Sequence, residues 1–115
     1  MSYMLLVVEP AGQRRTRSTA EGQLLYQRML EYAAKLKDRG VLVESNALRS
    51  AAARLTVREG RQSVIDGPFS ESKELVGGFF LLDCATREQA LEFAAECPAA
   101  AWATIEVREV GPCFD

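Results

Sequence analysis

Leu75-Val76-Gly77-Gly78-Phe79-Phe80-Leu81-Leu82-Asp83 is the stretch that decides the fold, because its apolar residues do not alternate with polar ones. A strand of this kind is expected to be covered on both faces. The two glycines indicate a bulge or a place where another group approaches the backbone closely. The run from Met4 to Val8 has the same two-faced character. These two segments are therefore the predicted central strands of a sheet.

Two helices with clear start signals separate the predicted strands. Ser18 and Glu21 form an S-x-x-E capping box, Gly40 ends that helix, and Thr86 and Gln89 open the second one. The apolar stripe of the first helix is interpreted as core and not as a cofactor site. The predicted strands cover residues 3–8, 41–48, 75–83 and 102–110, and a hairpin with a Glu59-Gly60 turn is inserted at about 54–65.

This order of elements predicts a single ferredoxin-like α+β domain over residues 1–115, with a βαββαβ plan plus the inserted β-hairpin. Both helices are expected on one face of an antiparallel sheet, which leaves the other face apolar and open. Burying one large apolar side chain contributes roughly 1.5–3 kcal/mol. We therefore expect a homodimer through the helix-free sheet face, a dimeric α/β-barrel-like assembly, with a monomer covered by its own hairpin as the alternative.

The composition excludes several classes of function. The net charge of −2 gives no general reason for nucleic acid to bind. The chain has no histidine, and its three cysteines lack metal-ligand spacing, so we expect neither a metal nor another cofactor. The run from Met4 to Val8 is too short for a signal peptide or membrane span, which favours the cytoplasm. The basic segment Gln13–Arg17 is read as a solvated loop, or alternatively as one that recruits an anionic ligand.

Several motifs, taken in order, resemble the DGPF branch of the YCII-related proteins over nearly the whole chain. They are Tyr3-Met4-Leu5-Leu6, Val64-Ile65-Asp66-Gly67-Pro68-Phe69, Glu71-Ser72-Lys73-Glu74, Gly77-Gly78-Phe79-Phe80, Glu96-Cys97-Pro98 and Thr104-Ile105-Glu106-Val107-Arg108. The resemblance implies a dimeric ferredoxin-like fold. It also implies a largely uncharacterised function and an association with sigma factors of the extracytoplasmic type.

The wider family is thought to include enzymes built on a His–Asp pair, among them a dechlorinating enzyme. The resemblance makes Asp66 the acidic member of such a pair, but the histidine has no counterpart here. Many relatives carry His or Tyr followed by Gly just before the last strand, where this chain has Trp102-Ala103. Whether the chain is an enzyme therefore stays open.

Three interpretations of Asp66 compete. In the structural one, Asp66 accepts backbone N–H groups in a turn, Gly67 supplies an unusual φ, Pro68 fixes the next φ and Phe69 anchors the loop in the core. In the catalytic one, Asp66 is a general acid–base whose pKa is raised by apolar surroundings, with Glu106 as a possible second carboxylate.

In the binding interpretation, Asp66 lies at the rim of a cleft. Trp102 then stacks on a ligand, or alternatively anchors the dimer interface. Arg54 or Arg108 neutralises the ligand, and Glu106 or Thr104 orients it. The predicted ligand site thus consists of Asp66, Gly67, Pro68, Phe69, Trp102, Arg54, Glu106 and Arg108.

The favoured function is a homodimeric small-molecule-binding or accessory module with a pocket near Asp66. One alternative is a small cofactor-independent enzyme, of lyase or hydrolase type, that uses Asp66. Another is an adaptor associated with sigma-factor-dependent transcription, which rests on the resemblance alone.

Overall fold

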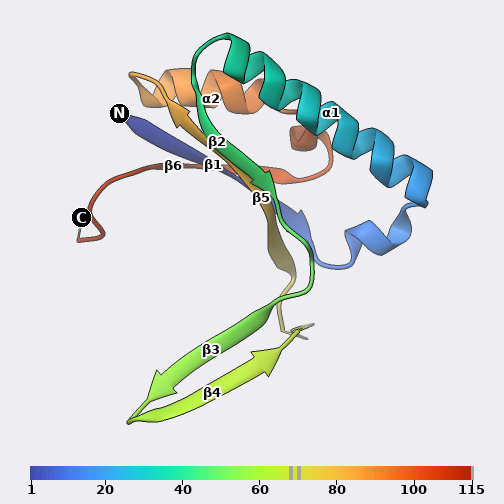
Figure 1. The fold of residues 1–115 in the computed structure, drawn as a ribbon, viewed down its shortest axis with the longest axis vertical. Helices are drawn as coiled ribbons and strands as arrows, with labels where there is room; N and C mark the ends of the chain where they lie inside the picture. The colour runs from blue at the N-terminus through green and yellow to red at the C-terminus, as the bar shows by residue number, and fades with distance from the viewer. Residues whose placement is uncertain (68, 70, 115) are drawn as a thin grey trace.

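The computed structural model describes residues 1–67, 69 and 71–114. Figure 1 shows the order strand, helix, strand, hairpin, strand, helix, strand that the sequence predicts. The elements are β1 (Ser2–Pro10), the 3-10 helix η1 (Gln13–Thr16), α1 (Thr19–Asp38), β2 (Leu42–Ala47), β3 (Ala53–Arg58), β4 (Arg61–Asp66), β5 (Glu74–Asp83), α2 (Arg87–Glu96), the 3-10 helix η2 (Pro98–Ala101) and β6 (Thr104–Glu109).

The main sheet has the strand order β2-β5-β1-β6, and its neighbouring strands are all antiparallel. The two-faced strands β1 and β5 lie in the middle, as predicted, and pair Leu5 with Phe80. Alternate residues of these strands are buried against the two helices. The core is formed by Tyr3, Leu5, Val7, Tyr32, Leu36, Phe80, Leu82, Cys84, Ala90, Ala94, Cys97 and Ala99. This arrangement confirms the ferredoxin-like α+β fold.

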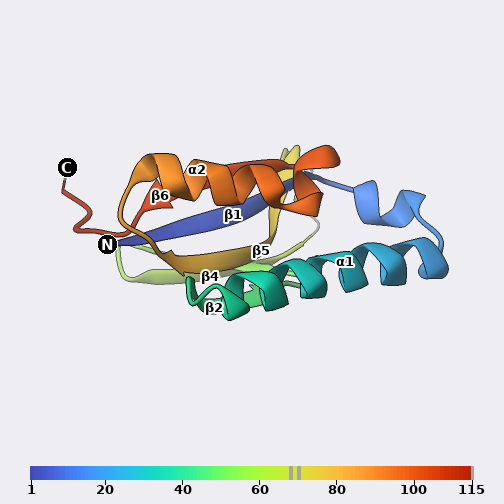
Figure 2. The same ribbon diagram turned by 90° about the horizontal axis from the view of Figure 1, so that it is seen from above.

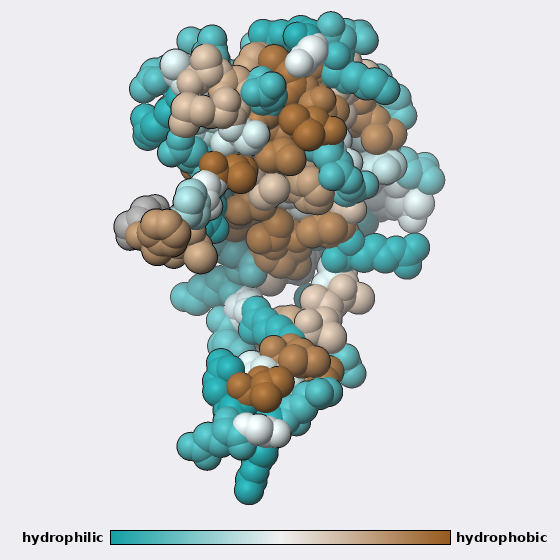
Figure 3. All heavy atoms as spheres, turned by 60° about the vertical axis from the view of Figure 1, so that its left-hand side comes forward, coloured by the Kyte–Doolittle hydropathy of each residue, from teal (hydrophilic) through white to brown (hydrophobic). Residues whose placement is uncertain are grey.

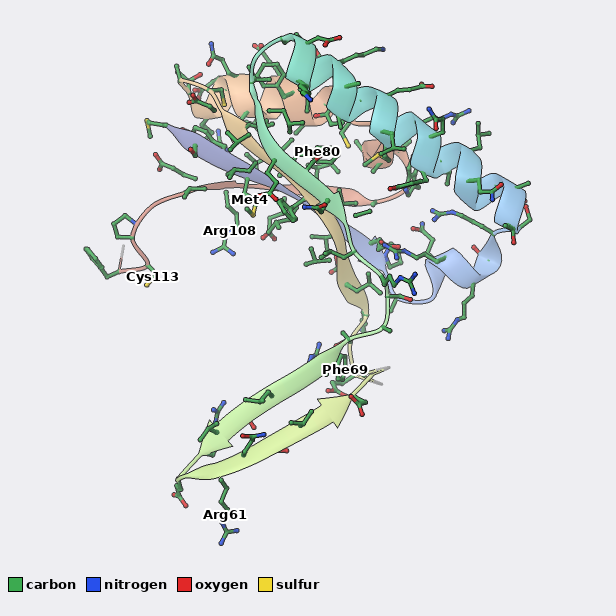
Figure 4. The ribbon with its side chains drawn as sticks, in the orientation of Figure 1. Met4, Arg61, Phe69, Phe80, Arg108 and Cys113 are labelled. Carbon is green, nitrogen blue, oxygen red and sulfur yellow. The ribbon has the colours of Figure 1, made fainter. Side chains whose placement is uncertain are left out.

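The second face of the central strands is also apolar, as the sequence predicts. Met4 and Leu6 of β1 lie opposite Leu81 and Phe79 of β5, and all four are only half-buried in the single chain. Arg108 of β6 pairs with Met4, and Figure 4 shows both side chains on the side of the sheet away from the helices. We call this surface the open face.

Two strand boundaries differ from the prediction. β1 continues to Pro10, whereas the sequence indicated an end before this residue. Pro10 is tolerated because it pairs only with Glu74 of β5, while the pairing with β6 ends at Val8. At the other end of the chain, β6 begins at Thr104 and not at Trp102. Trp102 belongs to the connection that follows η2.

The predicted helix caps are present. The Ser18 hydroxyl accepts a hydrogen bond from the Glu21 N–H at 3.1 Å, and the Thr86 hydroxyl accepts one from the Gln89 N–H at 3.1 Å. Gly40 has a φ of 75°, the left-handed conformation expected after a helix end.

The β3–β4 hairpin forms a separate two-stranded sheet. Its turn has positive φ at both central positions, 52° at Glu59 and 76° at Gly60, as a tight hairpin requires. Figure 1 shows the hairpin extending away from the body, on the side opposite the helices. The radius of gyration is 16.0 Å, whereas a compact domain of this length has about 13 Å. In Figure 3, apolar side chains gather separately on the body and on the hairpin.

Candidate functional site

A cavity of about 590 Å³ lies between the N-terminal half of α1 and the sheet. Its volume falls within the roughly 300–1,000 Å³ that is usual for small-molecule sites. Apolar lining comes from Val7, Leu25, Met29 and Phe80. The charged residues of the lining are Glu9, Arg14 and Arg17. Polar side chains also line it, from Ser18, Thr19, Tyr26, Ser45 and Asn46, so the cavity combines apolar walls with polar groups, as ligand sites do.

The cavity lies where α1 extends past the edge strand β2. A helix of 20 residues spans about 30 Å, whereas the six-residue strand β2 spans roughly 20 Å. Figure 2 shows the N-terminal part of α1 running past the ends of the strands. Tyr32 and Leu36, in the C-terminal half, are buried, whereas Leu25 and Met29 line the cavity. Met29 is also packed against the core, whereas Leu25 is not, so the prediction that the whole apolar stripe is core is wrong at Leu25.

A partly buried ion pair lies on the sheet side of the cavity. The Glu9 side chain is 7% exposed, and its carboxylate accepts hydrogen bonds from Arg14 Nε at 3.0 Å and from Arg14 Nη2 at 2.6 Å. Arg14 also donates to the carbonyl oxygen of Leu48 at 2.7 Å and to that of Gly77 at 3.3 Å. The guanidinium thus joins β1, η1, β5 and the connection after β2. Planar bidentate geometry of this kind fixes a site strongly.

Gly77 makes room for this ion pair. A Cβ atom at position 77 would lie 1.8 Å from Glu9 Oε1 and 2.7 Å from Arg14 Nη2. The register of β1 and β5 shifts at this point, since Val7 pairs with Gly78 and Val8 with Val76. The structure therefore confirms both features that the glycine pair predicted, a bulge and a close approach to the backbone.

Trp102 lies at the same cavity, next to Arg17 of the basic segment. The Arg17 guanidinium is 5.8 Å from the centre of the Trp102 ring, near the outer limit for a cation–π contact. Gln13 Nε2 donates a hydrogen bond of 2.8 Å to the Trp102 carbonyl oxygen. None of the described residues forms a hydrogen bond with the buried Gln13 Oε1. Of the predicted ligand residues, Trp102 is thus one that lines the cavity.

Asp66 lies elsewhere, at the end of β4, and its side chain is exposed. The described residues that line the cavity do not include it. Its carboxylate accepts no hydrogen bond from the described residues; the Gly67 N–H instead donates to the Ala52 carbonyl oxygen at 2.8 Å. The described residues thus leave Asp66 exposed, whereas a general acid–base was expected in apolar surroundings, and Asp66 lies on the hairpin while Glu106 lies on β6. Its role stays a prediction.

The residues after Asp66 differ from the predicted turn. Gly67 does not have a positive φ. It is instead confined by space, since an added Cβ atom would lie 3.3 Å from the Ala52 carbonyl oxygen and 3.3 Å from the Phe69 ring. Phe69 is half-buried and lies outside the core cluster. Pro68 lies outside the described residues.

Arg54 and Phe69, both predicted ligand residues, contact each other. The Arg54 guanidinium stacks 3.7 Å from the centre of the Phe69 ring. It also donates to the Ser72 hydroxyl at 2.9 Å and lies 3.6 Å from the Glu71 carboxylate. These contacts hold the base of the hairpin together, and Figure 4 shows Phe69 at that base.

Glu106 and Arg108 lie on the open face, opposite Leu6 and Met4. Both are exposed and neither lines the cavity. If the last strand began at Trp102, as predicted, the alternation of its side chains would place Trp102 on the same face as Glu106 and Arg108. It lies instead on the helix side, because the chain turns between η2 and β6. The seven predicted ligand residues that the structure describes thus fall into three places: the cavity, the hairpin base and the open face.

Two buried thiols and a buried phenol belong to the core cluster. Cys84 and Cys97 are buried free thiols, whereas Cys113 is exposed. Burial raises the pKa of the Cys84 and Cys97 thiols, and burial also raises the pKa of Tyr32, whose hydroxyl donates to the Phe93 carbonyl oxygen. Among the described residues, no group of acidic side chains and cysteines is arranged to hold a metal ion. No helix within the described ranges is long and apolar enough to cross a membrane.

Sequence reasoning missed the pairing of Glu9 with Arg14. A signal was present, since a lone glutamate ends an apolar central strand and arginines follow within a few residues. A buried carboxylate needs a cation, and the glycine pair provided the space. The sequence alone could not show which of the three neighbouring arginines pairs with Glu9, because that depends on the path of the backbone.

Comparisons with known proteins found a family match and a relative. The profile of the YCII-related domain matches residues 1–113. A protein of Rhizobium meliloti (strain 1021), named only as uncharacterized, is 49% identical over 47 residues. That alignment covers 41% of this chain and 38% of the relative.

Proposed function

The chain belongs to the YCII-related family, whose domain extends over residues 1–113, and we propose that it is a homodimer that binds a small molecule beneath α1. The observation that carries the proposal is the cavity of about 590 Å³ with apolar walls and a fixed ion pair at one end. The proposed pocket lies at Glu9, Arg14 and Trp102 and does not use Asp66.

The geometry supports binding by a preformed site. The ion pair is fixed by hydrogen bonds to backbone atoms of two separate segments, at Leu48 and Gly77. The opposite wall is a capped helix whose C-terminal half is packed in the core. A site on such elements needs little ordering when a ligand enters, which favours affinity. Met29 in the wall is a flexible side chain that adapts to different ligand shapes.

A ligand screen by thermal unfolding tests this proposal. Gly22 lines the cavity, and a Cβ atom there would meet nothing within 4 Å. Gly22→Leu should therefore fold and fill part of the cavity, while Gln23→Leu adds an apolar side chain at the neighbouring exposed position. Compounds that stabilise the wild type, by about 2.7 kcal/mol at a hundred times Kd, should stabilise Gln23→Leu and not Gly22→Leu. Equal stabilisation of both variants, or no stabilising compound at all, would contradict a site in this cavity.

The homodimer is supported by the surface area of the single chain. The chain exposes 8359 Å², whereas a compact monomer of this mass exposes roughly 6,200 Å². The excess of roughly 2,000 Å² exceeds the ~800 Å² that each partner buries in a standard interface. The apolar open face, with Met4, Leu6, Phe79 and Leu81, is the surface that a second copy would cover.

The hairpin adds a second apolar surface to the proposed interface. Leu55 and Val64 are a cross-strand pair and share a face with Val57; they are 59%, 53% and 55% exposed. An isolated two-stranded hairpin is marginally stable in water, so a partner surface over this face would stabilise it. The opposite face carries Thr56 and Ser63, also a cross-strand pair.

Light scattering tests the assembly. The wild type should have a mass of twice 12.7 kDa. The double variant Leu55→Lys/Val64→Lys should dissociate at concentrations where Thr56→Lys/Ser63→Lys, which adds the same charge to the other hairpin face, remains dimeric. A monomeric wild type would refute the dimer. If the two double variants dissociate equally, the apolar face of the hairpin is not part of the dimer interface.

A further inference from the structure

We propose that the cavity binds a molecule with one negative charge, a carboxylate on an apolar body, and that Arg17 beside Trp102 recognises this charge. The inference rests on the proposed binding function and names its ligand class. It starts from the observation that the positive and negative side chains that line the cavity do not neutralise one another.

Among the described residues that line the cavity, the fully charged side chains are Glu9, Arg14 and Arg17. Glu9 and Arg14 neutralise each other through contacts of 2.6–3.2 Å. All three guanidinium nitrogens of Arg14 are already engaged, by Glu9 and by the carbonyl oxygens of Leu48 and Gly77. Arg14 therefore uses its hydrogen-bond donors within the protein, and the side chains that line the cavity keep one positive charge that Glu9 does not neutralise.

That remaining charge is Arg17. It is half-buried, and its guanidinium forms no ion pair or hydrogen bond with the part of the chain that the structure describes. Its contact with the ring of Trp102, at 5.8 Å, is long enough to be weak. A guanidinium that lacks an acidic partner at the mouth of an apolar cavity is suited to a carboxylate, which it can hold through two parallel hydrogen bonds.

The other residues that line the cavity favour a ligand whose carboxylate is attached to an apolar body. Trp102 offers a flat aromatic surface next to Arg17, and Leu25, Met29 and Phe80 provide apolar walls farther along the cavity. A cationic ligand would meet an uncompensated like charge. A doubly charged phosphate ester would bring one charge more than the cavity neutralises, and an unpaired charge in an apolar site is costly.

Four compounds with one apolar body test the ligand class: 4-tert-butylbenzoate, 4-tert-butylbenzamide, 4-tert-butylbenzylammonium and 4-tert-butylphenyl phosphate. Trp102 is the only tryptophan in the chain, so its fluorescence reports binding directly. The benzoate should bind at least about tenfold more tightly than the amide, because a hydrogen bond to a charged group is lost in the amide. The ammonium compound and the phosphate should bind more weakly than the benzoate.

Arg17→Met should abolish the preference for the benzoate while leaving the amide affinity nearly unchanged. Arg15→Met is the matched control, because Arg15 is exposed in η1 and does not line the cavity. Arg15→Met should retain the tenfold preference. Circular dichroism and thermal unfolding establish that both variants are folded.

The outcomes separate the two proposals. If none of the four compounds binds, the cavity is not a ligand site and the proposed function fails together with this inference. If the benzoate and the amide bind equally, or if Arg17→Met and Arg15→Met behave alike, binding in the cavity survives and the assignment of charge recognition to Arg17 is wrong. Tighter binding of the ammonium compound or the phosphate would overturn the monoanionic ligand class.

Discussion

Gly77→Ala is the substitution for which the structure makes the sharpest prediction. The added methyl group would lie 1.8 Å from Glu9 Oε1 and 2.7 Å from Arg14 Nη2, so both charged groups would have to move. Glu9 has little room to do so, because its side chain is only 7% exposed and follows the core residue Val7 by two positions on the same strand face. The ion pair would therefore be separated and not merely shifted.

The expected loss of stability follows from that separation. Breaking a buried ion pair by removing one partner costs about 3–5 kcal/mol. Arg14 is 36% exposed and can turn to water, so the cost should lie nearer 2–4 kcal/mol. For a domain of this size, that corresponds to a melting temperature lower by roughly 8–20 °C. Urea and thermal unfolding, followed by circular dichroism at one fixed protein concentration, measure it.

Two controls test the reasoning. Gly111→Ala adds a methyl group where nothing lies within 4 Å, and should change stability by less than about 0.5 kcal/mol. In a Glu9→Ala background, Gly77→Ala should cost far less, because the carboxylate that collides with the methyl group is gone. If Gly77→Ala is as mild as Gly111→Ala, or if its cost is the same in both backgrounds, the ion pair is not what requires glycine at position 77.

Three further predictions concern the buried titratable groups and the hairpin turn. Burial raises the pKa of the Cys97 thiol above its ordinary value of 9.0, so its contribution to stability is complete below that pH. It is lost as the pH rises, because the unfolded thiol ionises first. Urea midpoints between about pH 8 and about pH 10.5 should fall less steeply for Cys97→Ala than for the wild type, and a parallel decline would contradict the assignment. Tyr32→Phe removes the hydrogen bond to the Phe93 carbonyl oxygen and should cost about 1–2 kcal/mol in urea unfolding; no loss would mean that the phenol is dispensable. Glu59→Asn should slow amide exchange in the hairpin, since Asn tolerates the φ of 52° better than Glu; unchanged or faster exchange would show that the turn does not limit hairpin stability.

Local residue chemistry was enough to predict most of the fold. The structure confirms the two-faced apolar strands, the Ser18 and Thr86 caps and the Glu59-Gly60 turn. Each of these features could be predicted because it depends on residues close together in the sequence. The sequence also predicted that something would approach the backbone at Gly77-Gly78. It did not predict that the approaching group is the Glu9–Arg14 pair.

The tertiary structure decided where the candidate site lies. Periodicity shows that Leu25 and Met29 belong to the apolar stripe of α1, but only the packing of α1 on the sheet places them at a cavity. The Asp66–Phe69 motif was predicted to mark the site, yet Asp66 is exposed at the hairpin base and Trp102 lies across the sheet, at the cavity beneath α1. Sequence spacing determines which residues share an element and a face. Which residues from different elements meet depends on how those elements pack, and here that packing brings Arg17 and Trp102 together.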